Sequence, residues 1–126
     1  GAREVHANVL EEIDHSDLKV YAVWEPILKT DNERAARKAT ALLDDPRVEH
    51  YWVSTRDVGK LFQDPIGLTT EPAWDVYLVY PRGVSWDQSP PRPAYFMHQL
   101  GGRLPAEKRL DATKLAARLK AILGDE

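Results

Sequence analysis

The chain has 126 residues, the size of one domain that buries about two thirds of the surface its unfolded chain exposes. Seventeen Lys and Arg residues against twenty Asp and Glu residues give a net charge of −3, without the basic stripe that binds nucleic acid. The sequence has no cysteine, which excludes disulfides, thiolate metal sites and thiol catalysis by these residues. The longest apolar run, over 20–24, is far too short to span a membrane, so we expect a soluble chain.

Apolar residues at helical spacing predict a first helix over 2–13. Residues 18–24 (LKVYAVW) are apolar on both faces after Lys19, which predicts a strand buried in the middle of a sheet. A capping box from Thr30 to Glu33 precedes a second helix. Residues 47–53 (RVEHYWV) predict the next strand.

A short helix over 54–62 and a loop over 64–72 are expected next. Residues 73–80 (AWDVYLVY) and 94–100 (AYFMHQL) predict two strands joined by a proline-rich loop, and a last helix ends at Gly124. The β-α-β steps require parallel pairing, whereas the last two strands pair antiparallel. The order therefore predicts an α/β fold, with a four-stranded mixed sheet and helices on both faces.

This order resembles the thioredoxin fold, a three-layer sandwich, as a single domain over 1–126 with its core over 18–123. The buried strand ends at Trp24 and continues through Glu25-Pro26 into a helix, where thioredoxins carry W-C-x-x-C. Glu71-Pro72 precedes a strand, where thioredoxins have a cis-proline, and Gly101-Gly102 matches the bend after their last strand. The resemblance thus implies a cis peptide bond between Glu71 and Pro72.

Trp24-Glu25-Pro26 and the stretch RVEHYW are also similar to poorly characterised, cysteine-free thioredoxin-like proteins of bacteria, which supplies no activity. Dithiol exchange is excluded, because it needs a thiolate nucleophile and a resolving thiol. Gly1 is typical of a cleavage scar, so the natural protein could have carried a signal peptide that was removed. Both the bacterial cytoplasm and the periplasm therefore stay open as the compartment.

In thioredoxin-like domains a groove binds an extended peptide through main-chain hydrogen bonds. The resemblance implies such a groove here, lined by Trp24, Glu25, Pro26, Trp52, Glu71, Pro72 and Gly101. The alternative is that the tryptophans of the predicted strands fill the core. We expect a module that binds a protein, peptide or other ligand, or acts as a scaffold, without a cofactor.

Two other functions stay open. The first is a hydrolase-like or transferase-like enzyme that uses Glu25 and Glu71, because two close carboxyls can work as an acid–base pair. The second is an oligomerisation module that uses the proline-rich loop, in which Trp86 is the candidate contact.

The remaining polar residues give no catalytic or metal site. The four histidines lack metal-binding spacing, and the predicted sheet places His50 and His98 on opposite edge strands, so no metal site is expected. Asp75 lies on a predicted central strand, where we expect it to accept hydrogen bonds from loop backbone because an isolated buried charge is costly.

Overall fold

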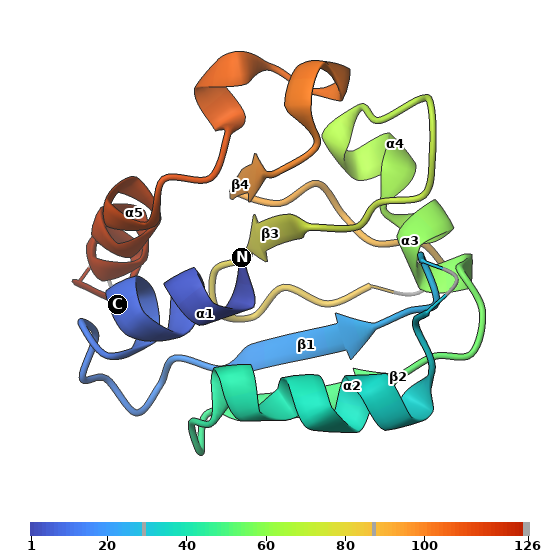
Figure 1. Cartoon of the computed structure of the whole chain (residues 1–126). Coiled ribbons are helices and arrows are strands. Elements are labelled where there is room, and N and C mark those ends of the chain that lie inside the picture. Colours follow the sequence, from blue (N-terminus) through green and yellow to red (C-terminus); the bar gives the residue numbers. More distant parts are fainter. Residues whose placement is uncertain (29, 87, 125–126) are drawn as a thin grey trace. The chain divides into compact units, whose positions relative to one another are not determined.

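The computed structural model describes residues 1–28, 30–86 and 88–124, and the chain is mixed α/β (Figure 1). It divides into two compact units. The first comprises Gly1–Arg56 and Ala112–Glu126, and the second comprises Asp57–Asp111. Each unit has its own pair of strands and is described by itself.

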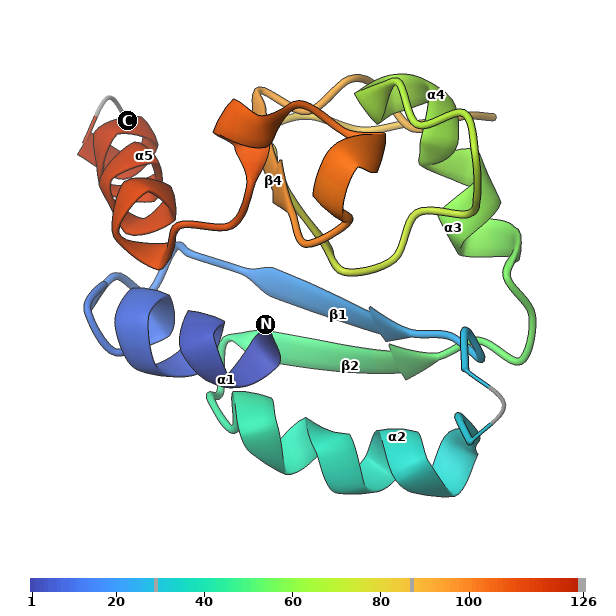
Figure 2. The ribbon, with the colours of Figure 1, turned by 45° about the horizontal axis from the view of Figure 1, so that its top comes forward.

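The first unit is built on a parallel pair of strands, β1 (Val20–Trp24) and β2 (Val48–Trp52). Between them the chain passes through α2 (Glu33–Ala39), which runs along the pair in the opposite direction (Figures 1 and 2). This is the crossover that a parallel pair requires, and it confirms the predicted parallel pairing. The helix begins at Asn32, whose side chain accepts a hydrogen bond from the Ala35 N–H, so the predicted cap at Thr30 is wrong.

The parallel pair has one exposed face, so the prediction of a strand buried on both faces is wrong. Tyr21 is 64% exposed, and Val23 and Tyr51 are 43% and 49% exposed. The Tyr21 and Tyr51 rings lie 6.5 Å apart, and the Tyr51 hydroxyl donates to Glu49 at 2.8 Å. The physical reason is that a carboxylate and two phenol hydroxyls share this face, and these groups favour water.

The N-terminal segment is helical over α1 (Ala2–Val5) and a π-helical turn, η1 (His6–Leu10), which ends three residues before the predicted boundary at residue 13. It packs against the C-terminal helix, α5 (Ala112–Gly124). A second short helix, η2 (Thr40–Leu43), continues α2. The apolar core of this unit draws on η1, α2, η2, α5 and the segment before β1, through Val9, Leu10, Ile13, Leu18, Ala36, Leu43, Ala112, Leu115 and Ala116.

The second unit begins with two short helices, α3 (Asp57–Leu61) and α4 (Gln63–Ile66). An antiparallel pair follows, β3 (Val76–Val79) and β4 (Tyr95–His98), which confirms the predicted pairing. The helical turns η3 (Gly101–Arg103) and η4 (Ala106–Lys108) complete the unit. Its core includes a cluster of Ile66, Leu68, Ala73, Leu100 and Leu104, with Phe62, Trp74, Val76, Leu78 and Phe96 packed against it.

The predicted four-stranded sheet is wrong for the part of the chain that the structure describes, which forms two separate two-stranded sheets. The backbone ahead of β3 explains why that strand is short. Asp75 has φ 51°, in the left-handed region, and the Ala73 N–H donates to the Gly59 carbonyl at 2.9 Å. Residues 73–75 are thereby withdrawn from strand geometry, and β3 has four residues instead of the eight predicted.

The Glu71–Pro72 bond is trans, as are all peptide bonds of the described residues, so the predicted cis bond is wrong. Trans is the lower-energy isomer for X–Pro bonds, by about 0.5–1 kcal/mol. The next residue, Ala73, donates its N–H to the Gly59 carbonyl of α3. The loss of the cis bond removes one of the three local likenesses to thioredoxin.

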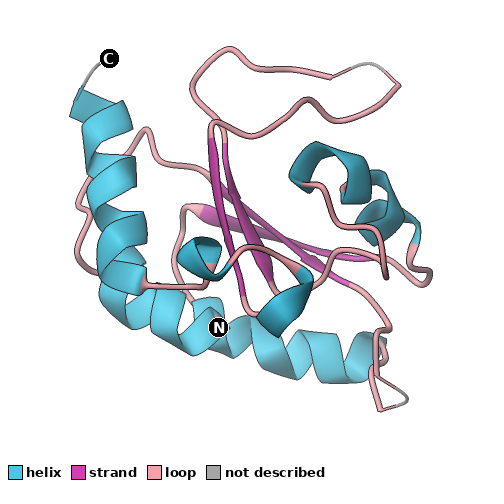
Figure 3. Cartoon of the chain, turned by 90° about the horizontal axis from the view of Figure 1, so that it is seen from above, coloured by secondary structure: helices cyan, strands magenta, loops and turns pink. Residues whose placement is uncertain are grey.

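Residues 81–86 and 88–93 form the proline-rich loop between β3 and β4, without helix or strand (Figure 3). The Tyr80 hydroxyl donates to the Pro91 carbonyl at 2.8 Å and joins the two ends of the loop. Trp86 is 48% exposed, and its ring centroid lies 5.3 Å from that of Phe62. Trp86, the candidate contact residue, therefore packs partly against a residue of its own unit.

Candidate functional site

Residues 25–28 form a short segment after β1, called the β1 loop below, and its N–H groups are bound by one carboxylate. The Asp31 Oδ2 atom accepts from the Ile27 N–H at 3.0 Å and from the Leu28 N–H at 2.6 Å. Asp31 follows the loop closely in sequence, and short acidic side chains commonly bind backbone N–H groups in this way.

The carbonyl groups of the same loop are bound by a cation. Arg56 donates from Nε to the Pro26 carbonyl at 3.0 Å and from Nη2 to the Ile27 carbonyl at 2.7 Å. The β1 loop is thus held through its N–H groups by Asp31 and through its C=O groups by Arg56. Neither holding residue belongs to the groove predicted from the sequence.

The held loop presents one large apolar side chain. Leu28 is 57% exposed, whereas Glu25 and Pro26 are half-buried. Glu25 makes a polar or electrostatic contact with another residue of the chain. The loop therefore offers a fixed backbone that carries an exposed leucine at the carboxyl end of a parallel pair, an end at which open α/β sheets commonly bind ligands.

The two tryptophans predicted for the groove lie side by side at the end of the pair, Trp24 beside Trp52, and both are half-buried. The Trp24 indole N–H donates to His50 Nδ1 at 3.1 Å, with the two rings stacked at 6.1 Å between centroids. His50 Nε2 lies 3.2 Å from the Leu43 carbonyl, and since a carbonyl only accepts, Nε2 carries the ring proton. The indole N–H of Trp24 is therefore bound within the first unit.

The other predicted groove residues, Glu71, Pro72 and Gly101, belong to the second unit. Glu71 Oε1 lies 3.2 Å from Arg103 Nε in an ion pair. Gly101, at φ 60°, starts the turn that carries Arg103. The pair brings the segment before β3 next to the bend after β4, as the predicted groove requires of these two segments. Arg103 itself was missed by the sequence analysis.

Asp75 is exposed, and its contacts differ from the expected ones. The Tyr77 hydroxyl lies 3.2 Å from Asp75 Oδ1 and 3.1 Å from Gln99 Oε1. The prediction that Asp75 accepts from loop backbone is therefore wrong, because β3 starts at Val76 instead of residue 73 and leaves the Asp75 carboxylate exposed just before the strand.

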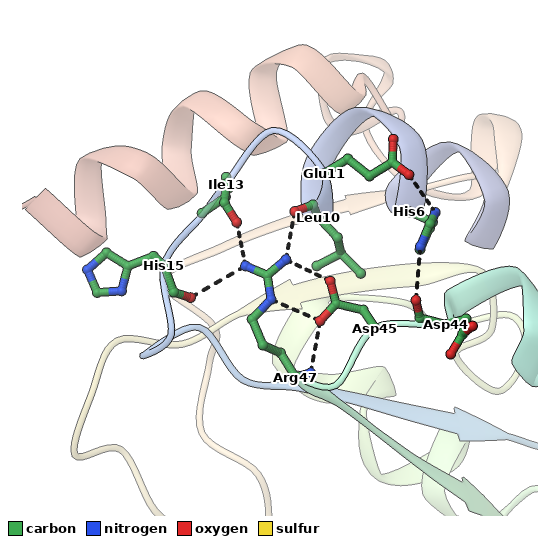
Figure 4. Close-up of polar contacts among 8 residues, drawn as sticks. All are labelled: His6, Leu10, Glu11, Ile13, His15, Asp44, Asp45 and Arg47. Carbon is green, nitrogen blue, oxygen red and sulfur yellow. Dashed lines mark hydrogen bonds and ion pairs between the residues drawn. The ribbon is translucent and has the colours of Figure 1, made fainter.

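The Arg47 side chain, which the sequence analysis did not single out, makes several hydrogen bonds within the first unit (Figure 4). Its guanidinium binds the Asp45 carboxylate in two places, Nε to Oδ1 at 3.0 Å and Nη2 to Oδ2 at 2.8 Å. It also donates to the carbonyls of Leu10, Ile13 and His15. The Arg47 cluster, as these five residues are called below, ties the end of η1 to the start of β2.

A second contact joins the same two regions. His6 Nε2 lies 3.2 Å from the Asp44 carbonyl, and His6 Nδ1 lies 3.6 Å from Glu11 Oε1 (Figure 4). Together with the Arg47 cluster, this contact fixes the N-terminal helical turns against residues 44–47.

The Arg47 cluster makes stability depend on pH in the acid range. The hydrogen bond from Arg47 lowers the pKa of Asp45 from 3.8 to about 2. A lowered folded-state pKa contributes stability that is present above pH 3.8 and is lost as the pH falls toward 2. We expect Asp45→Asn to cost about 2 kcal/mol above pH 5 and progressively less below pH 4, measured by urea unfolding of both proteins across this range. A cost independent of pH would contradict the assignment.

The histidines do not form a metal centre in the part of the chain that the structure describes, which contains no group of three or more His, Cys, Asp or Glu residues placed to hold a metal ion. His98 is completely buried, with Nε2 at 2.8 Å from the Pro105 carbonyl and Nδ1 accepting from the Leu100 N–H at 3.0 Å. Both ring nitrogens are thereby used within the second unit.

No helix within residues 1–28, 30–86 and 88–124 has the length and apolar character needed to cross a membrane. Comparison of the chain with protein-family models, with curated proteins and with solved structures gives no match.

Proposed function

We propose that the chain is a redox-inactive, thioredoxin-like binding module that contacts a protein or peptide partner through the β1 loop. The order of elements supports the class, since a parallel pair joined by a helix is followed by an antiparallel pair and a C-terminal helix. The absence of cysteine removes the dithiol chemistry of that class.

One observation carries the proposal: the Asp31 carboxylate and the Arg56 guanidinium together make four hydrogen bonds to the backbone of the β1 loop. Ordering a flexible loop on binding costs free energy, and a loop already fixed avoids most of that cost. The exposed Leu28 then needs only a complementary apolar surface. A partner with an apolar side chain facing Leu28 fits this geometry best.

The test uses peptides selected from a random dodecapeptide phage library on the immobilised protein, with affinities measured by isothermal titration calorimetry. Leu28→Ala should weaken the selected peptides about tenfold, or about 1.4 kcal/mol, because truncating an interface anchor has effects of this order. Arg56→Ala should weaken them several-fold, because it releases two carbonyls of the loop.

Leu61→Ala is the matched control, since Leu61 is 46% exposed and lies in the second unit. Its affinities should equal those of the wild type. Selected peptides that bind Leu28→Ala as tightly as the wild type would contradict the assignment of the loop.

A further inference from the structure

The outer edge of β2 is a second surface of the first unit, separate from the β1 loop. The Val20 N–H donates to the Arg47 carbonyl at 3.0 Å, and the Val53 N–H donates to the Trp24 carbonyl at 2.9 Å. Because bonding direction alternates along a strand, the odd-numbered residues of β2 face β1. His50 and Trp52 therefore point their N–H and C=O groups away from β1.

In the part of the chain that the structure describes, the N–H and C=O groups of His50 and Trp52 make no backbone hydrogen bond on this outer edge. The Val48 N–H, at the start of the edge, is already used by the Asp45 carbonyl at 3.0 Å. An unpaired strand edge is a template for another extended chain, which adds to the sheet through main-chain hydrogen bonds.

The same strand lines an open hollow of about 400 Å³. Leu43 and Val48 supply apolar surface, and His50 lies at one side. Two carboxylates line it as well, but Asp45 is bound by Arg47. Among the described residues the exposed Asp44 carboxylate has no hydrogen bond or ion pair. The hollow thus combines the apolar side chains of Leu43 and Val48 with one available negative charge, that of Asp44.

We infer that β2 accepts an added strand from an extended, basic peptide segment of a partner protein. The peptide backbone pairs with His50 and Trp52, and the aliphatic stem of a lysine or arginine lies over Leu43 and Val48 with its charge at Asp44. Long cationic side chains bury their stems in this way while keeping the charge near water. The inference goes beyond the proposed function, because it uses neither Leu28 nor the β1 loop.

The probe is an acetylated and amidated octapeptide of alternating valine and lysine. Two matched peptides separate the contributions, one with glutamate in place of lysine and one with every internal backbone nitrogen methylated. We expect the valine–lysine peptide to slow hydrogen exchange of the His50 and Trp52 amides at least tenfold at saturation. The glutamate peptide should bind at least tenfold more weakly, and the methylated peptide should not bind, because it cannot donate along either edge.

On the protein side, Asp44→Asn should weaken the valine–lysine peptide at least fivefold. Asp64→Asn, which changes an exposed carboxylate of the second unit, should leave its affinity unchanged. Leu28→Ala should also leave it unchanged, which separates this surface from the proposed function. Equal binding of the lysine and glutamate peptides, binding of the methylated peptide, or unchanged exchange at His50 and Trp52 would overturn the inference.

Discussion

Replacing Arg47 by alanine should lower the free energy of unfolding by about 3–5 kcal/mol, the range measured when one partner of a buried ion pair is removed. Arg47 and Asp45 are only 15% and 14% exposed in their side chains. The substitution leaves the Asp45 carboxylate without its cation. It also leaves the carbonyls of Leu10, at the end of η1, and of Ile13, in the segment after it, without their donor.

Urea unfolding followed by circular dichroism at pH 7 measures the effect. Arg37→Ala is the matched control, because Arg37 is 78% exposed and its ion pair with Glu33 at 3.1 Å spans one helical turn. The control should cost only about 0.5 kcal/mol. A loss for Arg47→Ala close to that of the control would show that the Arg47 cluster contributes little to stability.

Replacing His98 by leucine should cost about 2–4 kcal/mol, because it leaves the buried Leu100 N–H unsatisfied, at about 1–3 kcal/mol, and removes a second hydrogen bond worth about 0.5–1.5 kcal/mol. The two ring nitrogens of His98 now bind the Pro105 carbonyl and the Leu100 N–H. Leucine has a comparable size and is apolar, so the main change is the lost hydrogen bonding rather than a cavity.

Amide hydrogen exchange of β4 and thermal unfolding both report this loss. His15→Leu provides the comparison, since His15 is partly exposed and accepts one hydrogen bond from the Asp17 N–H at 3.2 Å. Its cost should stay within about 1 kcal/mol. Equal losses for the two histidine substitutions would indicate that the hydrogen bonds of His98 are not what stabilises the second unit.

The positions of the two strands of the first unit could be predicted because they depend on residues that are close together in the sequence. Residues 48–52 alternate in character, and β1 is β-branched and aromatic, so the position of each strand follows from neighbouring residues. The Arg47 cluster could not be predicted from local sequence patterns. Arg47 binds backbone carbonyls 32 to 37 residues away, and a carbonyl group is the same for every residue type.

The candidate site was predicted in part for a similar reason. The end of β1 was identified from Trp24-Glu25-Pro26, but Arg56, which holds the loop there, comes 29 to 30 residues after the carbonyls it binds. The late start of β3 after Asp75 was equally hard to predict, because aspartate adopts a left-handed backbone more readily than most residues but seldom requires it. The predicted strand was therefore too long.

The first unit is discontinuous in sequence, since Gly1–Arg56 are completed by α5 from the other end of the chain. At about 5–20 residues per second, the ribosome needs several seconds after Arg56 to synthesise residues 57–124. Throughout that interval η1, which carries the buried side chains Val9 and Leu10, has no α5 to pack against. The unit therefore reaches its final packing only after translation has passed through the whole of the other unit.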